Sequence, residues 1–418
     1  MTLLPHQIKA LDATRDLTRV AYYLDMGLGK TFVGSEKLHS LGYRVNLVIC
    51  QKSKVDDWCE HFKTHYPEYT VYDLTTTKGY HGYLTATGKH IGVINYDLVW
   101  RRPEITSVGT LMLDESSMIQ HGNTKRTKFI SKIKHQACVL LSGTPCNGKY
   151  ENLLSQIWLL GWYIKASDYW DRYIDYELRD YSGYPVKEVK GYKHIDELKH
   201  KLREHGAVFM KTAEAGISLP DKVEQTIHMP TNAPYRQFMR DGIIHIGDDE
   251  LVGDTCLKEL LYARMICGSY NSSKLQAVED LLESTDERFI IFYNFQKEKE
   301  ALNILCKSLG RPVSFVDGQT KDLTAYEHSD KSVILIQYQA GAMGLNLQKC
   351  HRTIYFTLPL SSELYEQSKA RTARIGQEST CFYYNLIVKG SVEEHILSTL
   401  NIRQDYTDEL FRAQRRGE

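Results

Sequence analysis

The stretch Leu24-Asp25-Met26-Gly27-Leu28-Gly29-Lys30-Thr31 decides how the chain is organised. An apolar run, Val20 to Leu24, precedes it, and a helix-forming run, Phe32 to Leu41, follows it. A strand, a glycine-rich turn and a helix N-terminus can together hold a phosphate. The alternative is a glycine C-cap between two ordinary elements. We predict ATP bound here with Mg²⁺, through the backbone of Gly27, Leu28 and Gly29, the Lys30 ammonium and the Thr31 hydroxyl.

The composition is that of an ordinary globular protein. The chain has 418 residues, 42% hydrophobic and 25% charged, so two or three domains are expected. Lys plus Arg and Asp plus Glu number 52 each, which gives a formal net charge of zero. Any nucleic-acid surface must therefore be a local basic groove on a neutral body.

Cysteine usage and hydropathy predict the compartment. Nine cysteines lack any Cys-x-x-Cys pair, which favours reduced, buried thiols. We expect no signal peptide, and no apolar run approaches the ~20 residues of a membrane span. The predicted location is cytoplasmic, nucleoid-associated in a bacterium or phage and nuclear only in a eukaryote.

Short β-branched or aromatic runs alternate with helical patterns in two parts of the chain. Apolar strands separated by helices indicate parallel sheets covered on both faces, and two such sets indicate two α/β lobes. The predicted strands are Val45–Cys50, Tyr69–Leu74, Ile91–Tyr96, Thr110–Leu113 and Cys138–Leu141 in the first part, and Phe289–Tyr293, Val313–Val316, Val333–Tyr338, Thr353–Phe356 and Phe382–Ile387 in the last.

Between the two sets the pattern changes to Tyr-, Lys- and His-rich sequence with helical periodicity and several prolines. We predict helical insertions there and a hinge near Leu219–Lys222. The predicted domains are lobe one at 1–161, insertions and linker at 162–271, lobe two at 272–400, and a tail at 401–418 that is a mixed-charge helix or a frayed end.

Asp114 and Glu115 directly follow the apolar run Leu111 to Leu113. Ligands bind at the carboxyl ends of parallel strands, and an NTPase needs one carboxylate for Mg²⁺ and one to orient the attacking water. We predict Asp114 as a metal ligand and Glu115, with Lys30, as catalytic. The alternative is an N-cap or a solvated acidic turn.

Further clusters complete an ordered series that resembles the Swi/Snf-type DNA translocases of helicase superfamily two over nearly the whole chain. The resemblance implies two tandem RecA-like lobes, with Gln7 reading adenine and Gly344 as another nucleotide contact. The matching segments are Leu4–Gln7, Asp25–Thr31, Ile94–Asp97, Asp114–Ser117, Lys125–Lys128, Ser142–Pro145, Ser272–Lys274, Ile290–Phe295, Ala340–Gln348 and Gln367–Gln377.

Arg371 and Arg374 are spaced i, i+3, so we predict that they share a helix face and project together. An arginine that arrives from lobe two on closure can stabilise the charge that develops on the γ-phosphate, an effect worth ~10³–10⁵ in rate. Both are predicted as catalytic residues. The alternative is an exposed basic helix face.

Ser142 and Thr144 are poor acid–base groups but can sense a γ-phosphate through hydrogen bonds. We predict that they couple the nucleotide state to the other lobe; the alternative is a plain turn. Within the resemblance, Ser117 stands where the family usually has the histidine that closes the acidic box. The chain has Phe209-Met210-Lys211-Thr212 where the family often has an Arg-Arg-x-Lys stretch.

A translocating motor should hold the DNA backbone rather than the bases, because the sequence of its track varies. For each basic residue alone, an ordinary solvated position is the alternative. The DNA-binding candidates are Lys52, Lys54, Asn95, Tyr96, Lys125, Arg126, Lys128, Asn294, Lys297 and Asn346.

These features predict a monomeric, DNA-dependent ATPase that translocates on double-stranded DNA. One alternative is a strand-separating or fork-remodelling helicase, although no wedge element can be identified in the sequence. Others are an ATP-gated DNA clamp or recruitment module, and a motor that strips a protein from DNA. The sequence leaves the pathway open among repair, recombination, replication, restriction and remodelling.

Overall fold

The computed structural model describes residues 2–181, 184–216, 219–247, 249–338, 345–374 and 376–411. The chain divides into two compact units, which are described separately. Unit 1 contains Met1–Ile217 and Arg403–Glu418, and unit 2 contains Ser218–Ile402.

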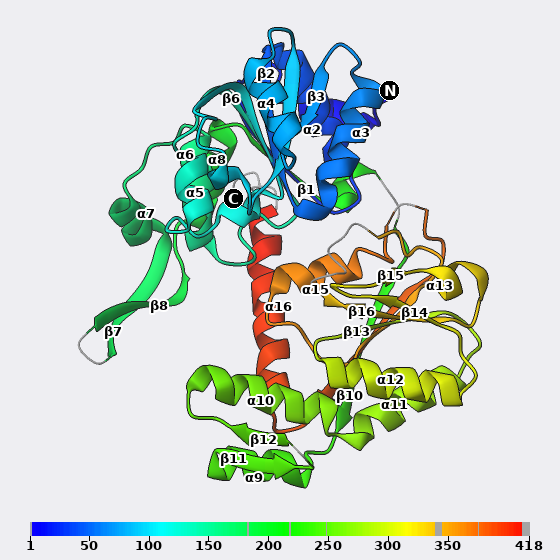
Figure 1. The fold of residues 1–418 in the computed structure, drawn as a ribbon. Helices are drawn as coiled ribbons and strands as arrows, with labels where there is room; N and C mark the ends of the chain where they lie inside the picture. Colours follow the sequence, from blue (N-terminus) through cyan, green and yellow to red (C-terminus); the bar gives the residue numbers. More distant parts are fainter. Residues whose placement is uncertain are drawn as a thin grey trace. The chain divides into compact units, whose positions relative to one another are not determined.

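Unit 1 is built on a seven-stranded sheet of order β3-β4-β2-β5-β6-β1-β9, in which every neighbouring pair is parallel (Figure 1). Residues along β2 alternate between the two faces, so Leu47 and Ile49 pack in one apolar core while Val48 and Cys50 pack in the other. The strands are β1 (Arg19–Leu24), β2 (Val45–Cys50), β3 (Thr70–Asp73), β4 (His90–Asn95), β5 (Ser107–Asp114), β6 (Lys134–Ser142) and β9 (Ala207–Met210).

Helices connect these strands, and an antiparallel hairpin of β7 (Ile174–Tyr181) and β8 (Tyr184–Tyr192) extends from the unit between α7 and α8 (Figure 1). At the base of the hairpin, Tyr192 stacks on Tyr150 with ring centroids 4.4 Å apart. The helices are α1 (Pro5–Asp12), α2 (Lys30–Leu41), α3 (Val55–His65), α4 (Thr77–Thr85), α5 (Lys125–Ile130), α6 (Leu154–Leu159), α7 (Ala166–Tyr173) and α8 (Ile195–Glu204).

Unit 2 has a second seven-stranded sheet, of order β10-β18-β17-β13-β16-β14-β15, parallel except for the β14–β15 pair. Its strands are β10 (Lys222–Met229), β13 (Phe289–Tyr293), β14 (Val313–Val316), β15 (Lys321–Asp322), β16 (Val333–Gln337), β17 (Arg352–Tyr355) and β18 (Cys381–Val388). The helices are α9 (Ala233–Asp241), α10 (Cys256–Ser269), α11 (Ser272–Glu283), α12 (Gln296–Ser308), α13 (Thr324–His328), α15 (Ser362–Lys369) and α16 (Val392–Phe411), and a small antiparallel pair is formed by β11 (Ile243–Ile246) and β12 (Asp249–Val252).

The two sheets confirm the predicted fold of two tandem RecA-like α/β lobes. The stretch 162–271, predicted as helical insertions and linker, contains the helices α7 to α10 and also the strands β7 to β12. The hairpin is exposed on much of its surface. The first seven residues of the edge strand β10, KVEQTIH, are all exposed or half-exposed, and five of them are polar. Such strands lack the apolar run that marks a buried one.

Candidate nucleotide site

The glycine-rich turn joins the end of β1, at Leu24, to the start of α2, at Lys30. Gly27 and Gly29 have φ of 88° and 73°, in the left-handed region that glycine adopts without steric cost. The Lys30 ammonium donates hydrogen bonds to the carbonyl oxygens of Leu24, at 2.9 Å, and Asp25, at 3.3 Å. The turn therefore has the backbone geometry of a phosphate cradle, with its lysine held inside it.

Helix α1 packs against this turn. The carbonyl oxygen of Leu28 lies 3.0 Å from His6 Nε2 and accepts a hydrogen bond of 3.2 Å from Gln7 Nε2. A Cβ atom at Gly29 would lie 2.3 Å from the same Gln7 nitrogen, so a larger residue there would displace the Gln7 amide and be strained at φ 73°. Gln7 thus lies at the nucleotide turn, and its role in reading adenine stays a prediction.

Residues that follow β9 also contact the glycine-rich turn. Thr212 donates two hydrogen bonds to Asp25 Oδ2, from its backbone N–H at 3.2 Å and from its hydroxyl at 3.1 Å. The Lys211 ammonium lies 3.7 Å from Asp25 Oδ1. Lys211 and Thr212 belong to the stretch that departs from the family pattern, and here they fix the start of the phosphate turn.

The acidic box follows β5, two strands from β1 in the sheet. The Trp58 indole N–H donates a 2.8 Å hydrogen bond to Asp114 Oδ2. Glu115 has a φ of 58° and is one of three described non-glycine residues with positive φ. This conformation costs about 1–2 kcal/mol for an L-residue, so the surrounding contacts must hold it.

The acidic box and the coupling segment touch directly. The Ser142 hydroxyl donates a 2.5 Å hydrogen bond to Glu115 Oε1, and the Ser117 hydroxyl donates a second, of 3.2 Å, to the same oxygen. Ser142 Oγ also accepts the backbone N–H of Thr144 at 3.1 Å. The Thr144 hydroxyl is buried and has no partner among the described atoms, which fits a group that awaits a phosphate oxygen.

Burial dominates the electrostatics of this cluster. It lowers the pKa of Lys30, although the charges of Glu115, Asp25 and Asp114 oppose that shift. It raises the pKa of Asp114 and of Glu115, and the Lys30 charge works in the other direction for both. A half-buried ammonium beside two half-buried carboxylates is an environment in which perturbed titration marks functional sites.

The residues present fit ATP and Mg²⁺. In the described ranges, no three or more His, Cys, Asp and Glu side chains gather as a protein-only metal site. Mg²⁺ is commonly held by one or two carboxylates together with phosphate oxygens. Thr31 and Asp114 would supply the protein oxygens here, and the glycine turn, with Gly27 and Gly29 at positive φ, would supply the phosphate cradle.

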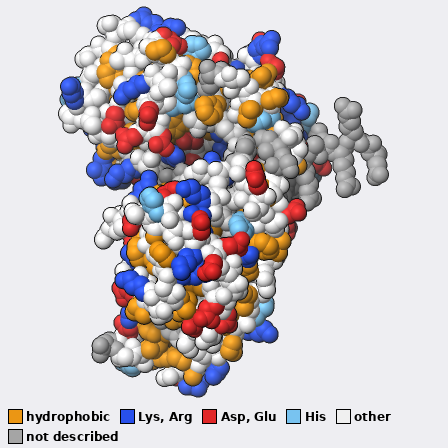
Figure 2. Space-filling view, turned by 90° about the vertical axis from the view of Figure 1, so that its right-hand side faces the viewer, with side chains coloured by type: hydrophobic (Ala, Val, Ile, Leu, Met, Phe, Trp, Pro, Cys, Tyr) orange, Lys and Arg blue, Asp and Glu red, His pale blue; other side chains and the backbone are white. Residues whose placement is uncertain are grey.

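The DNA candidates of unit 1 differ in accessibility. Lys52, Lys125 and Lys128 are exposed, while Arg126 is half-buried and pairs with Asp97 at 3.4 Å. Figure 2 shows Lys and Arg side chains interspersed with Asp and Glu over the face it displays. A role for these lysines on DNA stays a prediction.

Asn95 and Tyr96 are corrections to the DNA-contact set. Their exposed fractions are 6% and 1%, so neither side chain is presented to a partner. Instead the Tyr96 hydroxyl donates to the carbonyl oxygens of Asp114, at 2.9 Å, and Glu115, at 3.2 Å. The aromatic residue at the end of a buried strand thus braces the acidic box.

The arginine pair of unit 2 does not share a helix face, so that prediction was wrong. Helix α15 ends at Lys369, and Arg371 and Arg374 lie in the turns that follow it. The Thr372 hydroxyl bonds to the Lys369 carbonyl at 3.2 Å and to the Tyr383 hydroxyl at 3.0 Å. Such side-chain bonds to the backbone compete with the helix and favour its end here. The catalytic roles of the two arginines stay predictions.

Lys369 anchors the turn that carries the arginines. The Lys369 ammonium is buried and lies 2.8 Å from Glu224 Oε1 on β10 and 3.5 Å from a Glu366 oxygen. The Tyr365 ring lies 4.1 Å from the same ammonium. These neighbours raise the pKa of Lys369 despite its burial, so the residue stays charged and anchors the turn to the edge strand.

The remaining candidates of unit 2 are placed as follows. Asn294 Nδ2 donates to the Thr357 hydroxyl at 2.9 Å and to the Thr357 carbonyl at 3.2 Å, so it serves the fold of its own unit. Asn346 is exposed, and its Oδ1 accepts the Gln348 N–H at 3.4 Å. Gly344 lies outside the described residues.

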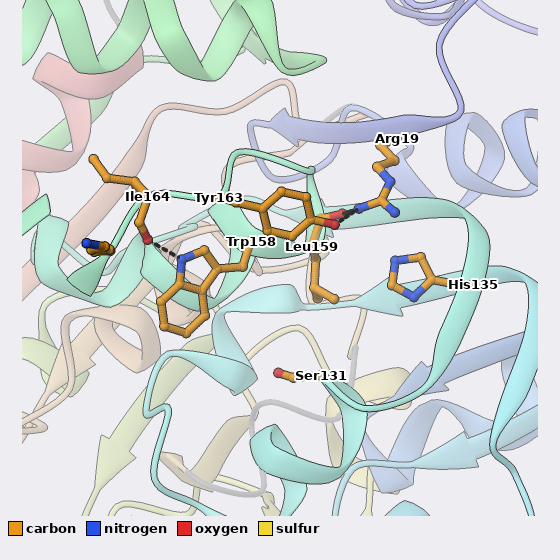
Figure 3. A pocket seen from close by; sticks show the side chains of 8 residues that line it. Arg19, Ser131, His135, Trp158, Leu159, Tyr163 and Ile164 are labelled. Carbon is orange, nitrogen blue, oxygen red and sulfur yellow. Dashed lines mark hydrogen bonds between the residues drawn. The ribbon is translucent and has the colours of Figure 1, made fainter. Parts of the chain in front are cut away.

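A pocket of about 450 Å³ lies at the amino-terminal ends of the strands of unit 1 (Figure 3). Arg19 starts β1 and His135 lies near the start of β6, whereas the nucleotide motifs follow the ends of strands. A six-residue strand is about 20 Å long, so this pocket is separate from the nucleotide site. Its lining is Arg19, Ser131, His135, Trp158, Leu159, Tyr163, Ile164 and Lys165.

Sequence reasoning missed the residues that hold the site in place. Trp58 contacts a residue 56 positions away, and Lys211 and Thr212 contact one more than 180 positions away. No local motif marks such a partner. The one available signal was the burial expected of an aromatic residue such as Tyr96 directly after an apolar strand.

None of the helices in the described ranges is both long and apolar enough to cross a lipid bilayer. All nine cysteines lie in described ranges and are unpaired thiols, and eight are buried. The prediction of buried cysteines is therefore confirmed for all but Cys256, which is exposed.

Comparison with known proteins identifies the class. The sequence matches the SNF2-related domain over residues 23–268 and the helicase conserved C-terminal domain over residues 273–376. Because the first match spans more than half of the 418 residues, the chain belongs to the SNF2-related family.

Individual relatives are distant. The candidate ATP-dependent helicase/translocase YwqA of Bacillus subtilis (strain 168) is 24% identical over 93% of this chain and 46% of its own length. The Mus musculus SWI/SNF-related matrix-associated actin-dependent regulator of chromatin subfamily A member 1 is 23% identical over 91% and 40%. The chain spans less than half the length of both relatives. A solved Sulfolobus solfataricus SWI2/SNF2 ATPase core in complex with dsDNA is 21% identical, covers 98% of this chain and 92% of its own, and has a TM-score of 0.45.

Proposed function

We propose that the chain is a DNA-dependent ATPase that translocates on double-stranded DNA as a cytoplasmic monomer. The observation that carries the proposal is the 2.5 Å hydrogen bond from Ser142 to Glu115, formed beside Lys30 and the glycine turn. It joins the group that would activate water to the group that would sense the phosphate. The ordered family matches over both halves of the chain support the same activity.

The roles of the residues in unit 1 follow from their chemistry. The backbone of the turn and the Lys30 ammonium would bind the β- and γ-phosphates, and Thr31 with Asp114 would hold Mg²⁺. Bound Mg²⁺ supplies positive charge that offsets the phosphate oxygens. Glu115, whose pKa burial raises, would orient the attacking water and accept its proton. Ser142 would then register the change in charge on Glu115.

Unit 2 would contribute to catalysis only when the two lobes close. Arg371 and Arg374 would reach the γ-phosphate when the lobes close, which makes hydrolysis depend on lobe geometry. The DNA backbone would be held by exposed groups such as Lys52, Lys125 and Lys128. Repeated closing and reopening would move one lobe along the duplex.

The hairpin β7–β8 favours a second candidate, a fork-remodelling activity. Strand separation needs a wedge, which could not be identified in the sequence, and this projecting hairpin could serve as one. Leu178 and Val186 on the hairpin are 65% and 46% exposed. Its charges are largely paired within the hairpin, as in Arg179 with Glu188 and Lys190 with Glu188. A projecting element with little net charge could part strands but would not attract the backbone by itself.

The test is the rate of ATP hydrolysis with single-stranded, double-stranded and forked DNA over a salt titration. We expect stimulation by double-stranded DNA that weakens as salt rises. Lys30→Ala and Glu115→Gln should lower the rate by on the order of 10³-fold, while Lys132→Ala, an exposed lysine of the same unit, should leave it unchanged. Absence of stimulation by every DNA would refute the proposal, and ATP-dependent unwinding of the fork would favour the second candidate.

A further inference from the structure

The strained backbone at Glu115 is held from two sides by the buried side chains of Tyr96 and Gln156. Glu115 has φ 58° and ψ 61° and lies between the end of β5 and a short 3₁₀ turn, Ser116–Ile119. In this conformation its side chain accepts the Ser142 hydroxyl. A left-handed non-glycine residue persists where its surroundings over-determine it, so the neighbours on each side of this peptide matter.

Tyr96 holds one side. It follows β4, its exposed fraction is 1%, and its hydroxyl donates to the carbonyl oxygens of both Asp114 and Glu115. One phenol therefore bridges two consecutive carbonyls, at 2.9 Å and 3.2 Å. The bridge fixes the two peptide planes on either side of the strained residue.

Gln156 on α6 holds the other side. Its exposed fraction is 0%, and its Oε1 accepts hydrogen bonds from the Ser116 hydroxyl, at 2.7 Å, and the Tyr23 hydroxyl, at 3.0 Å. Its Nε2 donates to the Pro145 carbonyl at 2.6 Å. A carbonyl can only accept, so the Pro145 contact fixes which end of the amide is nitrogen.

The Gln156 amide thus connects three elements of unit 1. Tyr23 belongs to the strand before the phosphate turn, Ser116 directly follows Glu115, and Pro145 ends the coupling segment. All three partners are buried with it. A buried amide that bonds through both its oxygen and its nitrogen favours one arrangement of its partners, and a change at any of them leaves a buried group unpaired.

We propose that Tyr96 and Gln156 are positioning residues that together hold Glu115 in its left-handed conformation, aimed at Ser142 and the γ-phosphate. The inference rests on the proposed function for its effect on rate. Its structural part, the clamping of the acidic box, stands on the contacts alone. Neither side chain touches the phosphate turn, so nucleotide affinity should depend on them little.

The experiment compares Tyr96→Phe and Gln156→Met with the full-length wild type. The matched control is Tyr169→Phe, because Tyr169 is a fully buried tyrosine of the same unit whose hydroxyl also donates to a backbone carbonyl, that of Tyr150 at 2.6 Å. We expect kcat for ATP to fall about tenfold in each brace variant with KM unchanged, since a lost buried hydrogen bond corresponds to about a tenfold change in an equilibrium. Tyr169→Phe should lose thermal stability by a similar amount but keep its kcat.

Amide hydrogen exchange gives a readout that needs no activity. The Met118 N–H donates to the Glu115 carbonyl at 3.0 Å. Its exchange should be about tenfold faster in both brace variants and unchanged in Tyr169→Phe. Equal exchange in all four proteins, or a kcat loss in Tyr169→Phe as large as in Tyr96→Phe, would overturn the inference. An inactive wild type with the expected exchange pattern would refute the proposed function and leave the brace standing.

Discussion

The two units use their motif residues in different ways. In unit 1 the residues of separate motifs bond to one another, as Ser142 does to Glu115 and Thr212 to Asp25. In unit 2 they bond to the scaffold, as Lys369 does to Glu224 and Asn294 to Thr357. We infer that the motif residues of unit 1 form a chemical site, and that the scaffold of unit 2 holds its arginines in a fixed position.

The burial of acidic groups shows the same difference. Asp114 and Glu115 lie beside the ammonium of Lys30, which opposes the rise in their pKa. Glu298 of unit 2 is fully buried and accepts the N–H groups of Asn294 and Phe295. Burial raises its pKa to about 7. The first pair suits phosphate and metal chemistry, whereas Glu298 secures a loop.

The largest expected effect tests whether unit 2 takes part in the chemistry at all. Arg374→Ala should bind ATP nearly as the wild type does and hydrolyse it on the order of 10³-fold more slowly, because the charge supplied on closure is lost. Single-turnover hydrolysis and nucleotide binding measure the two effects separately. Arg236→Ala, on α9, is the control. Unaltered turnover in Arg374→Ala would remove unit 2 from the chemical step.

A smaller effect concerns the stability of the unit 2 scaffold. The Lys274 ammonium lies 2.6 Å from Glu393 Oε1 and 2.6 Å from the Phe356 carbonyl, and both side chains of the pair are at most 2% exposed. Lys274→Met would leave a buried carboxylate without its partner, which costs about 3–5 kcal/mol of unfolding free energy. Chemical denaturation measures the change. The control is the exposed Lys258→Met, expected within about 0.5 kcal/mol of the wild type.

The smallest effect concerns pH. The pKa of Glu298 in the folded state, about 7, is above its ordinary 4.5, so the folded state binds more protons between these values. Stability should therefore fall as pH rises from 4.5 to 7, by up to about 3 kcal/mol from this group. Denaturation of Glu298→Gln should show a shallower pH dependence than the wild type. Glu300→Gln, an exposed residue of the same helix, should match the wild type; identical slopes in all three proteins would exclude a titrating Glu298.

The sequence predicted what depends on local pattern. Each buried strand appeared as an apolar run, and the phosphate turn and acidic box follow strands β1 and β5 as expected. The edge strand β3 was predicted, whereas the edge strands β9, β10 and β15 and the hairpin were missed. Exposure leaves polar residues along β10 and the hairpin, but β9, AVFM, was missed although it is apolar. The helix expected to carry Arg371 and Arg374 ends early, because the hydroxyl of Thr372 binds the backbone instead.

Contacts between distant residues could not be predicted. Tyr96 was expected to face DNA. Its hydroxyl instead donates to the carbonyl oxygens of Asp114, the last residue of β5, and Glu115, the residue after it. Gln156 reads as one polar position on an apolar helix, and only the folded sheet brings Tyr23, 133 positions away, to its amide. Pattern indicates where a side chain is buried, and only the three-dimensional fold decides what it meets.

Helix α16 has a consequence for how the chain must be made. Its residues up to Ile402 belong to unit 2, and those from Arg403 onward belong to unit 1, where the Tyr406 carbonyl accepts the Tyr150 hydroxyl at 2.8 Å. Unit 1 is therefore discontinuous in sequence. A ribosome that synthesises from the N-terminus delivers the last piece of the first lobe only after the whole second lobe. Cutting the chain between the lobes would also leave the base of the hairpin without its Tyr406 neighbour.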